Sequence, residues 1–152
     1  SKGNELSDNV SIYAENMGAK SVYISAKIEA EVSQLEHEHE KVEFLAAIGL
    51  EQTGLVRLIK AGYSLLNLIT YFTAGPKETR AWTVACGTSA QKAAGRIHSD
   101  FARGFICAET ISLVDYLELG GEQEAKLAGK MRQEGRGYLV QEGDIILYRF
   151  NV

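Results

Sequence analysis

The sequence changes from helical to β patterning at Asn67, and this change constrains the possible folds more than any other feature. Two runs rich in β-branched and aromatic residues, Leu68–Thr73 and Thr79–Val84, follow that point. Between them lies the segment Ala74–Lys77, which consists of turn-forming residues and holds the only proline of the chain. Because such residues readily reverse the chain direction, the pattern predicts a β-hairpin.

The residues after the hairpin predict a helix, a strand, helical turns and two closing strands. The helix should begin at Thr88, with Gln91 completing a capping box. The later elements are expected at Phe105–Ser112 (strand), Leu113–Leu119 and Glu122–Lys130 (helical turns), and Tyr138–Gln141 and Ile145–Asn151 (strands joined by a tight turn at Glu142–Asp144). This order of elements is that of a β-grasp, or ubiquitin-like, fold.

Residues 1–66 are patterned mainly as helices. Ser7 or Asp8 can cap a helix that runs to about Met17 and ends at Gly18. The further elements expected here are a strand at Ser21–Ser25, a helical segment at Ile28–Ile48 broken near Leu35, and a helix at Leu55–Leu66. The helix–strand–helix order is typical of the edge of a larger α/β sheet, so the fold class expected is α+β, with a mostly helical α/β part before the β-grasp part.

Composition and charge limit the partners. Residues 1–65 contain 6 Lys and Arg against 10 Asp and Glu, which gives −4, whereas residues 66–152 contain 10 of each and are neutral overall. Attraction to a polyanion is therefore expected only from the second part, and only where its charges segregate onto one face. No apolar run reaches the roughly 18 residues of a membrane helix. Cys86 and Cys107 are too few for a disulfide framework and are expected to be reduced and buried in a cytoplasmic protein.

The sequence contains only weak signals for catalytic or metal-binding sites. No G-x-x-x-x-G-K-[ST] phosphate loop occurs. In the run Glu36–Glu40 the two histidines are two residues apart, so on a helix they do not share a face, and a solvated acidic surface is expected instead of a metal site. His98 and Asp100 lack a visible nucleophile, so we expect a structural histidine and no catalytic residue, although a small stand-alone enzyme built on them or on the cysteines is one alternative. Tyr71 and Trp82 are expected in the core or on the sheet face.

Four segments carry a specific resemblance that covers nearly the whole chain. They are ISAKIEAEV (24–32), TYFTAGPKETRAWTV (70–84), AAGRIHSDFARGFICAE (93–109) and GKMRQEGRGYLVQEGDIILYRFNV (129–152). In these segments the chain resembles the C-terminal part of YchF-type nucleotide hydrolases of the Obg family. The departures are Gln91, where the family usually has proline, and Gly137, where aspartate is common.

The resemblance implies a domain organisation and an activity. Residues 1–49 would end the nucleotide-binding domain, 50–66 would form a connecting helix, and 67–152 would be a TGS domain with the β-grasp fold. The parent would be a P-loop hydrolase of ATP or GTP with magnesium, and its phosphate loop would precede Ser1. This chain alone is therefore expected to hold no cofactor and to be inactive. Ser25, Ala26 and Lys27 resemble the family's S-A-K loop, which would border the nucleotide base in the intact protein.

TGS domains occur in proteins that work on ribosomes and transfer RNA, so the resemblance implies a ribosome or RNA partner under the control of nucleotide state. The basic residues of the second part are the candidates for phosphate contact: Lys77, Arg80, Lys92, Arg96, Lys130, Arg132, Arg136 and Arg149. The alternatives are an ordinary mixed-charge surface and a pure protein–protein interaction module that never meets nucleic acid. Helix 55–66 joins the two parts, so we expect coupling to pass through it.

Overall fold

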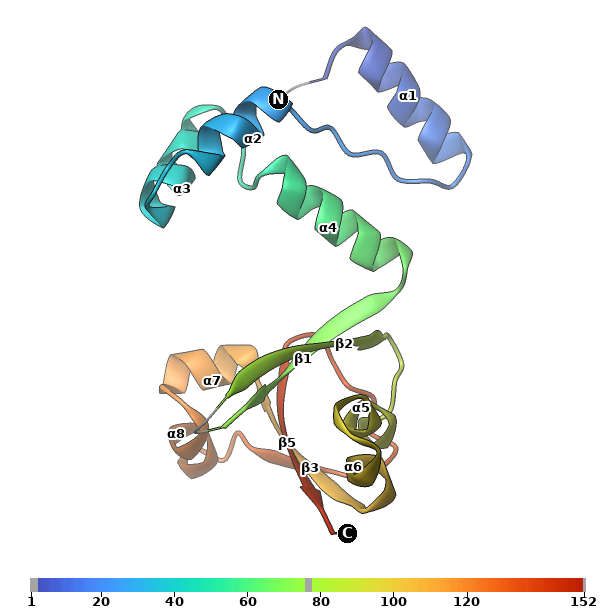
Figure 1. Cartoon of the computed structure of the whole chain (residues 1–152), viewed down its shortest axis with the longest axis vertical. Coiled ribbons are helices and arrows are strands. Elements are labelled where there is room, and N and C mark those ends of the chain that lie inside the picture. Colours follow the sequence, from blue (N-terminus) through green and yellow to red (C-terminus); the bar gives the residue numbers. More distant parts are fainter. Residues whose placement is uncertain (1–2, 76–77, 152) are drawn as a thin grey trace. The chain divides into compact units, whose positions relative to one another are not determined.

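The computed structural model describes residues 3–75 and 78–151, and the chain divides into two compact units, Ser1–Leu66 and Asn67–Val152 (Figure 1). The described part of the first unit is helical, whereas the second unit contains a five-stranded mixed sheet with helices. The fold class is therefore α+β, as predicted. Among the described residues, no helix has both the length and the apolar character needed to cross a membrane.

Helix α1 (Glu5–Asn16) begins earlier than the sequence suggested. Asn4 is its N-cap, because the Asn4 side chain accepts a hydrogen bond from the Ser7 backbone N–H at 3.0 Å and the Ser7 hydroxyl accepts one from the Asn4 N–H at 2.7 Å. The prediction of Ser7 or Asp8 as the cap was wrong, since Ser7 supplies the second half of the capping box from inside the helix. Gly18 has φ 68° just past the helix end, as predicted for a glycine terminator.

The segment Ser21–Ser25 is not a strand. Its residues are assigned to no regular element, and Ser25, with φ −102° and ψ 107°, serves as the N-cap of helix α2 (Ala26–Ser33). A strand exists only where a neighbouring strand completes its hydrogen bonds, and no described strand lies against this segment. β propensity alone therefore gave the wrong prediction here.

Helices α3 (Glu38–Ala47) and α4 (Gly54–Leu65) complete the described first unit. The gap between α2 and α3 confirms the predicted break near Leu35. Thr53 caps α4 by accepting a hydrogen bond from the Val56 N–H at 3.2 Å. Among the described residues of this unit, Val32 and Leu45 are the buried apolar side chains, so the unit has a small core of its own.

The second unit is built on a sheet with strand order β2-β1-β5-β3-β4. The bounds are β1 Leu68–Ala74, β2 Thr79–Ala85, β3 Phe105–Ser112, β4 Arg132–Glu134 and β5 Asp144–Phe150. Strands β1 and β2 form the predicted antiparallel hairpin; Pro76 and Lys77 of its turn lie outside the described residues. The last strand, β5, lies in the centre, parallel to β1 and antiparallel to β3, which is the β-grasp arrangement.

The helices of this unit are α5 (Ala90–Ile97), α6 (Ser99–Arg103), α7 (Leu113–Leu119) and α8 (Glu122–Leu127). The predicted capping box of α5 was wrong, because Ser89 is the N-cap residue. The Thr88 hydroxyl instead donates to the Ala85 carbonyl at 2.6 Å, and the Gln91 amide donates to the Ala102 carbonyl at 2.9 Å. A local turn therefore takes the Thr88 hydroxyl and a contact with α6 takes the Gln91 amide, so neither side chain completes the predicted cap.

The predicted strand at Tyr138–Gln141 was also wrong, although the predicted tight turn before the last strand is present, with the Asp144 N–H donating to the Gln141 carbonyl at 3.2 Å. This segment makes one isolated bridge, Ser89 to Leu139, and its Gln141 N–H donates to the buried Asp144 carboxylate at 2.8 Å. The strand that pairs with β3 at the sheet edge is β4, which the sequence did not reveal because Arg132–Glu134 is short and polar.

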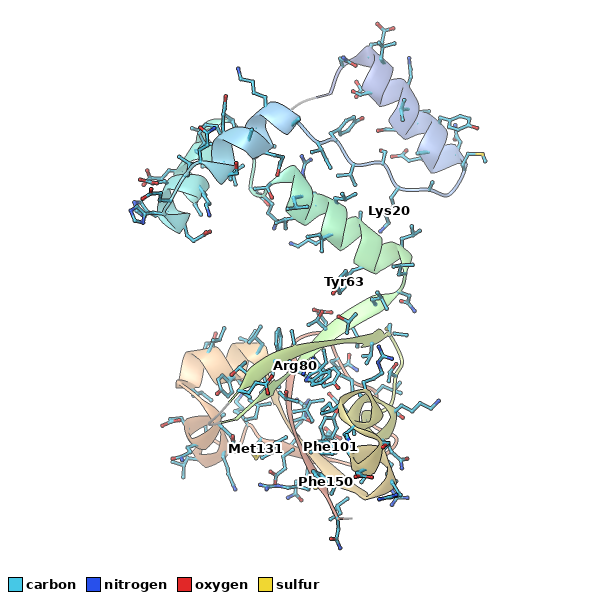
Figure 2. All side chains as sticks on the ribbon, viewed as in Figure 1. Lys20, Tyr63, Arg80, Phe101, Met131 and Phe150 are labelled. Carbon is cyan, nitrogen blue, oxygen red and sulfur yellow. The ribbon has the colours of Figure 1, made fainter. Side chains whose placement is uncertain are left out.

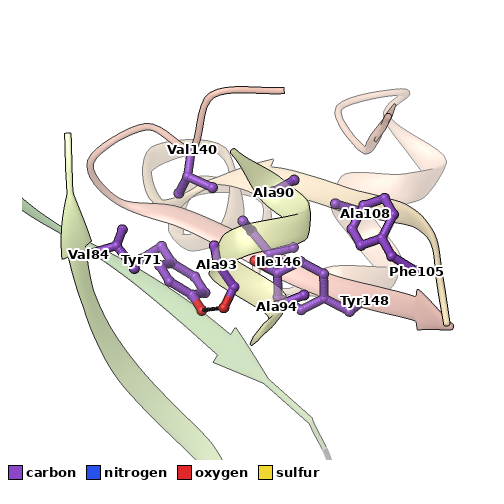
Figure 3. Close-up of a cluster of buried hydrophobic side chains, with 10 residues drawn as sticks. All are labelled: Tyr71, Val84, Ala90, Ala93, Ala94, Phe105, Ala108, Val140, Ile146 and Tyr148. Atoms are coloured by element: carbon purple, nitrogen blue, oxygen red, sulfur yellow. Dashed lines mark hydrogen bonds between the residues drawn. The ribbon is translucent and has the colours of Figure 1, made fainter. Parts of the chain in front are cut away.

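The core lies between α5 and one face of the sheet (Figure 3). Alanines of α5 allow the helix to approach large aromatic residues of the strands, among them Tyr71, whose ring meets Tyr148 edge to face at 6.3 Å. The Tyr71 hydroxyl donates to the Ala93 carbonyl at 2.9 Å, as the dashed line in Figure 3 shows. Tyr71 is fully buried and Trp82 is half-buried against this cluster, which confirms their predicted place in the core.

We predict that Tyr71 contributes to a loss of stability at alkaline pH. Burial raises the pKa of Tyr71 from 10.0 to about 12, so the native state holds its proton more tightly than the unfolded chain does. The stabilisation is therefore complete below pH 10 and is lost between pH 10 and 12, with a contribution of about 2 to 3 kcal/mol. Denaturant unfolding at pH 9 and pH 11.5 should show a smaller loss for Tyr71→Phe than for the unchanged chain; equal losses would contradict the assignment.

A second prediction concerns Gly104, which lies where α6 turns into β3. A Cβ atom at this position would overlap the backbone of Asn151, whose N–H donates to the Gly104 carbonyl at 2.9 Å. Backbone atoms cannot yield as a flexible side chain can, so Gly104→Ala should destabilise the unit by about 2 to 3 kcal/mol. Gly137→Ala is the matched control, because a Cβ there meets no atom within 4 Å. Thermal unfolding of the two variants measures the difference.

Candidate functional site

The predicted base loop, Ser25 to Lys27, lies at the start of α2. The Ser25 hydroxyl accepts a hydrogen bond from the Ile28 N–H at 3.4 Å, which fixes the turn from the extended segment into the helix. Lys27 is exposed and its ammonium lies 3.8 Å from the Glu31 carboxylate on the next turn. Ser25 is thus the N-cap and Ala26 and Lys27 are the first two residues of α2, so the segment that we call the base loop is itself a helix N-terminus.

Two side chains tie this loop to α4. The Arg57 guanidinium donates to the Tyr23 carbonyl at 2.7 Å, just before the loop. Just after it, the Glu29 carboxylate accepts hydrogen bonds from the N–H groups of Gly54 at 2.6 Å and Leu55 at 3.4 Å. A carboxylate at this place also meets the positive end of the α4 dipole. Sequence reasoning missed Glu29 and Arg57, because their partners lie 25 or more residues away in the chain.

The histidines have local roles. His37 is the N-cap of α3, and its ring stacks on His39 with centroids 5.5 Å apart. Within the described residues, no group of three or more His, Cys, Asp and Glu side chains is placed to hold a metal ion. His98 Nδ1 accepts a hydrogen bond from the Asp100 N–H at 3.2 Å, and the Asp100 carboxylate pairs with Arg103 at 2.9 Å. His98 therefore caps helix α6, as expected of a structural histidine.

Both cysteines are free thiols, but neither is buried. Cys86 is exposed in the turn after β2, and Cys107 is half-buried on β3. The prediction of two buried thiols was therefore wrong. The physical reason is their position: Cys86 comes after the last sheet-paired residue of β2, outside the face that α5 covers.

Several of the predicted phosphate-binding cations are engaged by groups of the unit itself. Lys130 pairs with Asp115 at 3.0 Å, and Arg132 pairs with Glu134 at 3.1 Å. Hydrogen bonds from Ser112 and then from Lys130 hold the pKa of Asp115 below its ordinary value. The remaining engaged cations are Arg136, which donates to the Phe105 carbonyl at 3.3 Å, and Arg149, which pairs with Glu109 at 2.8 Å.

Three other cations of the predicted set are available at the surface. Lys92 and Arg96 are exposed on successive turns of α5 and line a hollow of about 310 Å³ beside β2. Within the described parts of the chain, neither pairs with a carboxylate. Arg80 lies on β2 with its guanidinium 4.3 Å from the centroid of the Trp82 ring, and Figure 2 labels it. Lys77 lies outside the described residues. The other predicted cations thus fall into two groups, those engaged by groups of the unit and those available at its surface.

An exposed aromatic residue lies at the end of β5, beside α6. Phe101 on α6 stacks on Phe150 at the end of β5, with ring centroids 3.9 Å apart (Figure 2). Phe150 is exposed to solvent. The side of the sheet covered by α5 and α6 thus presents both positive charge and aromatic rings, a combination that suits single-stranded nucleic acid.

The opposite face of the sheet carries a larger hollow of about 640 Å³. It lies between the hairpin end and the α7–α8 turn, with Leu147 and Arg149 of β5 among its lining residues. Because successive residues of a strand point to opposite faces, Leu147 faces away from the core that holds Ile146 and Tyr148. This side carries Asp115, Glu118, Glu122 and Glu124 on α7 and α8 and is therefore acidic.

We predict an asymmetric response to the loss of either partner of the Arg149–Glu109 pair. Glu109 is buried at 8% exposure, whereas half of the Arg149 side chain is exposed. Arg149→Met should destabilise the unit by about 1 to 2 kcal/mol, because it leaves a buried carboxylate unpaired. Glu109→Gln should cost less, because the arginine can turn to water. Denaturant unfolding measures both; an equal or reversed order would contradict the structural role of this pair.

Comparison with protein-family models identifies a family for the second unit. The family model YchF-GTPase_C, described as a protein of unknown function (DUF933), matches residues 68–151, which is more than half of the chain. Its start coincides with the first residue of β1.

Comparison with individual proteins extends the similarity to the first unit. Two relatives, both named ribosome-binding ATPase YchF, come from Haemophilus ducreyi (55% identical over 151 residues) and Bacillus subtilis (53% over 150 residues). Each match covers 99% of this chain and 41% of the relative. The solved structure of the Schizosaccharomyces pombe YchF GTPase matches with a TM-score of 0.79 at 30% identity, over 96% of this chain and 39% of that chain. The chain thus spans about two fifths of the length of these relatives.

Proposed function

We propose that this chain, which belongs to the YchF family, is the C-terminal part of a nucleoside-triphosphate hydrolase that binds the ribosome through its β-grasp unit. The observation that carries the proposal is the 55% identity, over 99% of this chain, to a protein named a ribosome-binding ATPase. Identity at this level extends through both units, so the proposal concerns residues 1–66 as well as the β-grasp unit.

The proposed organisation follows from this relationship. Residues 1–49 end the nucleotide-binding domain, 50–66 form the connecting helix, and 67–152 form a TGS domain. In the intact protein, ATP or GTP is bound with magnesium, and the Ser25–Lys27 loop borders the base. Location of the intact protein in the cytoplasm, where ribosomes are found, agrees with this assignment.

The ribosome contact that we propose is an electrostatic one to RNA, made by the α5 side of the β-grasp unit. The exposed cations Lys92 and Arg96 lie on this side, together with Arg80 on the neighbouring strand. The acidic helices α7 and α8 lie on the other side of the sheet. A unit with zero net formal charge can therefore still orient itself toward a polyanion, because its charges are segregated.

The predicted effect of charge reversal on α5 tests this contact. Lys92→Glu combined with Arg96→Glu, in the intact protein, should reduce co-sedimentation with ribosomes by about tenfold or more at low salt, since repulsion replaces two phosphate contacts. Binding by the unchanged protein should weaken steeply between 50 and 200 mM salt. Lys126→Glu is the matched control, because it reverses an exposed charge on the acidic side.

The alternative is a protein–protein interaction module, in which a sheet edge or an apolar surface docks a protein and nucleic acid plays no part. Binding that is insensitive to salt and unchanged in the Lys92→Glu, Arg96→Glu variant would favour this alternative. One feature favours this alternative. Strand β2 is an edge strand of the described sheet, so its outer side can pair with a strand of a partner protein.

A further inference from the structure

We propose that Arg57 and Glu29 are positioning residues for the nucleotide base, and that together they join the Ser25–Lys27 loop to the first turn of α4. This inference rests on the proposed function, since it assumes that the loop borders the base in the intact protein. It adds two residues that the loop motif does not contain, and it couples the loop to helix α4. The proposal rests on two contacts: Arg57 bonds to the chain just before the loop, and Glu29, just after the loop, bonds to the start of α4.

The Arg57 contact fixes the chain before the loop. Its guanidinium donates to the Tyr23 carbonyl at 2.7 Å, two residues ahead of Ser25. A hydrogen bond from a charged donor to a backbone acceptor is stronger than a neutral one. The Nε of Arg57 is buried and has no hydrogen-bond partner among the described atoms, so burying this side chain costs free energy. The bond to Tyr23 is therefore the polar contact through which Arg57 acts on the loop.

The Glu29 contact fixes the chain after the loop. Glu29 lies two residues past Lys27, and its carboxylate reaches the Gly54 N–H at 2.6 Å. The approach is close because residue 54 is glycine: a Cβ there would lie 3.0 Å from the Glu29 oxygen and 3.1 Å from a methyl carbon of Ile24. The absence of a side chain at position 54 thus allows the carboxylate to occupy the N-terminus of α4.

These contacts give the loop one rigid support. Both ends are bonded to residues 54–57, which form a single helical turn of α4. A small displacement of that turn therefore moves the loop, and an ordered loop pays less conformational entropy when it binds a base. Two residues, Leu66 and Asn67, separate the end of helix α4 from the start of β1. The same turn that orders the base loop thus belongs to the helix that leads into the β-grasp unit.

The test measures affinity for the base separately from affinity for the phosphates. In the intact protein, Arg57→Met keeps the aliphatic bulk and removes the bond to Tyr23, and Glu29→Gln keeps an acceptor but removes the charge. We expect Arg57→Met to weaken ATP binding about tenfold, and Glu29→Gln to weaken it less. Affinity for magnesium tripolyphosphate, which has no base, should stay unchanged in both variants. Arg57→Lys should restore part of the ATP affinity, since lysine keeps one donor.

Matched controls are Lys60→Met on the same helix, whose ammonium donates to Gln52 at 2.9 Å, and Glu43→Gln on α3. Both should bind ATP as the unchanged protein does. The proposal is overturned if the ratio of ATP to tripolyphosphate affinity is unchanged in Arg57→Met and Glu29→Gln. An unchanged ratio with both affinities lowered would show a general loss of structure. If the unchanged protein itself binds ATP no more tightly than tripolyphosphate, the assignment of the base loop fails instead.

Discussion

The close approach of α5 to the sheet is the contact on which the β-grasp unit depends. Three alanines of α5, at positions 90, 93 and 94, are fully buried, and they face the large rings of Tyr71, Phe105 and Tyr148. Small residues on the helix thus pack against large residues on the strands. The hydroxyl of Tyr71, which would be costly to bury alone, is satisfied by the Ala93 carbonyl. A larger side chain at any of the three alanines would separate the layers.

This packing also decides where the charges of the unit lie. Since the side of α5 that faces the sheet is occupied by buried alanines, Lys92 and Arg96 lie on its outer side. On the other sheet face, α7 and α8 carry Glu118, Glu122 and Glu124, which pair with no cation among the described residues, while Lys130 and Arg149 are engaged with acidic neighbours. The polar surface proposed for RNA is thus a consequence of how the core is built.

Sequence patterns gave the hairpin, β3, β5 and the helices α3 and α4 because each has a local signal, such as β-branched runs around a turn or apolar residues at helical spacing. They gave a false strand at Ser21–Ser25, because that segment has β propensity but no neighbouring strand. They missed β4 because Arg132–Glu134 is stabilised by pairing with β3 and not by its own residue types. Strand identity is a property of the sheet, so single segments predict it poorly.

The candidate site shows the same limit for side chains. The base loop was predicted from the family resemblance and the list of cations from residue types, but the partners of these residues could not be predicted from either. Arg149 and Glu109 are 40 residues apart, and Arg57 and Tyr23 are 34 apart, so no local spacing reveals either contact. Neutral net charge left open whether the cations were free or engaged. The fold separates the two kinds of cation. A cation bonded to a buried carboxylate such as Glu109 must leave that partner unpaired before it can contact a phosphate. Lys92 and Arg96 form no ion pair with the described residues, so a phosphate contact there breaks none of these pairs.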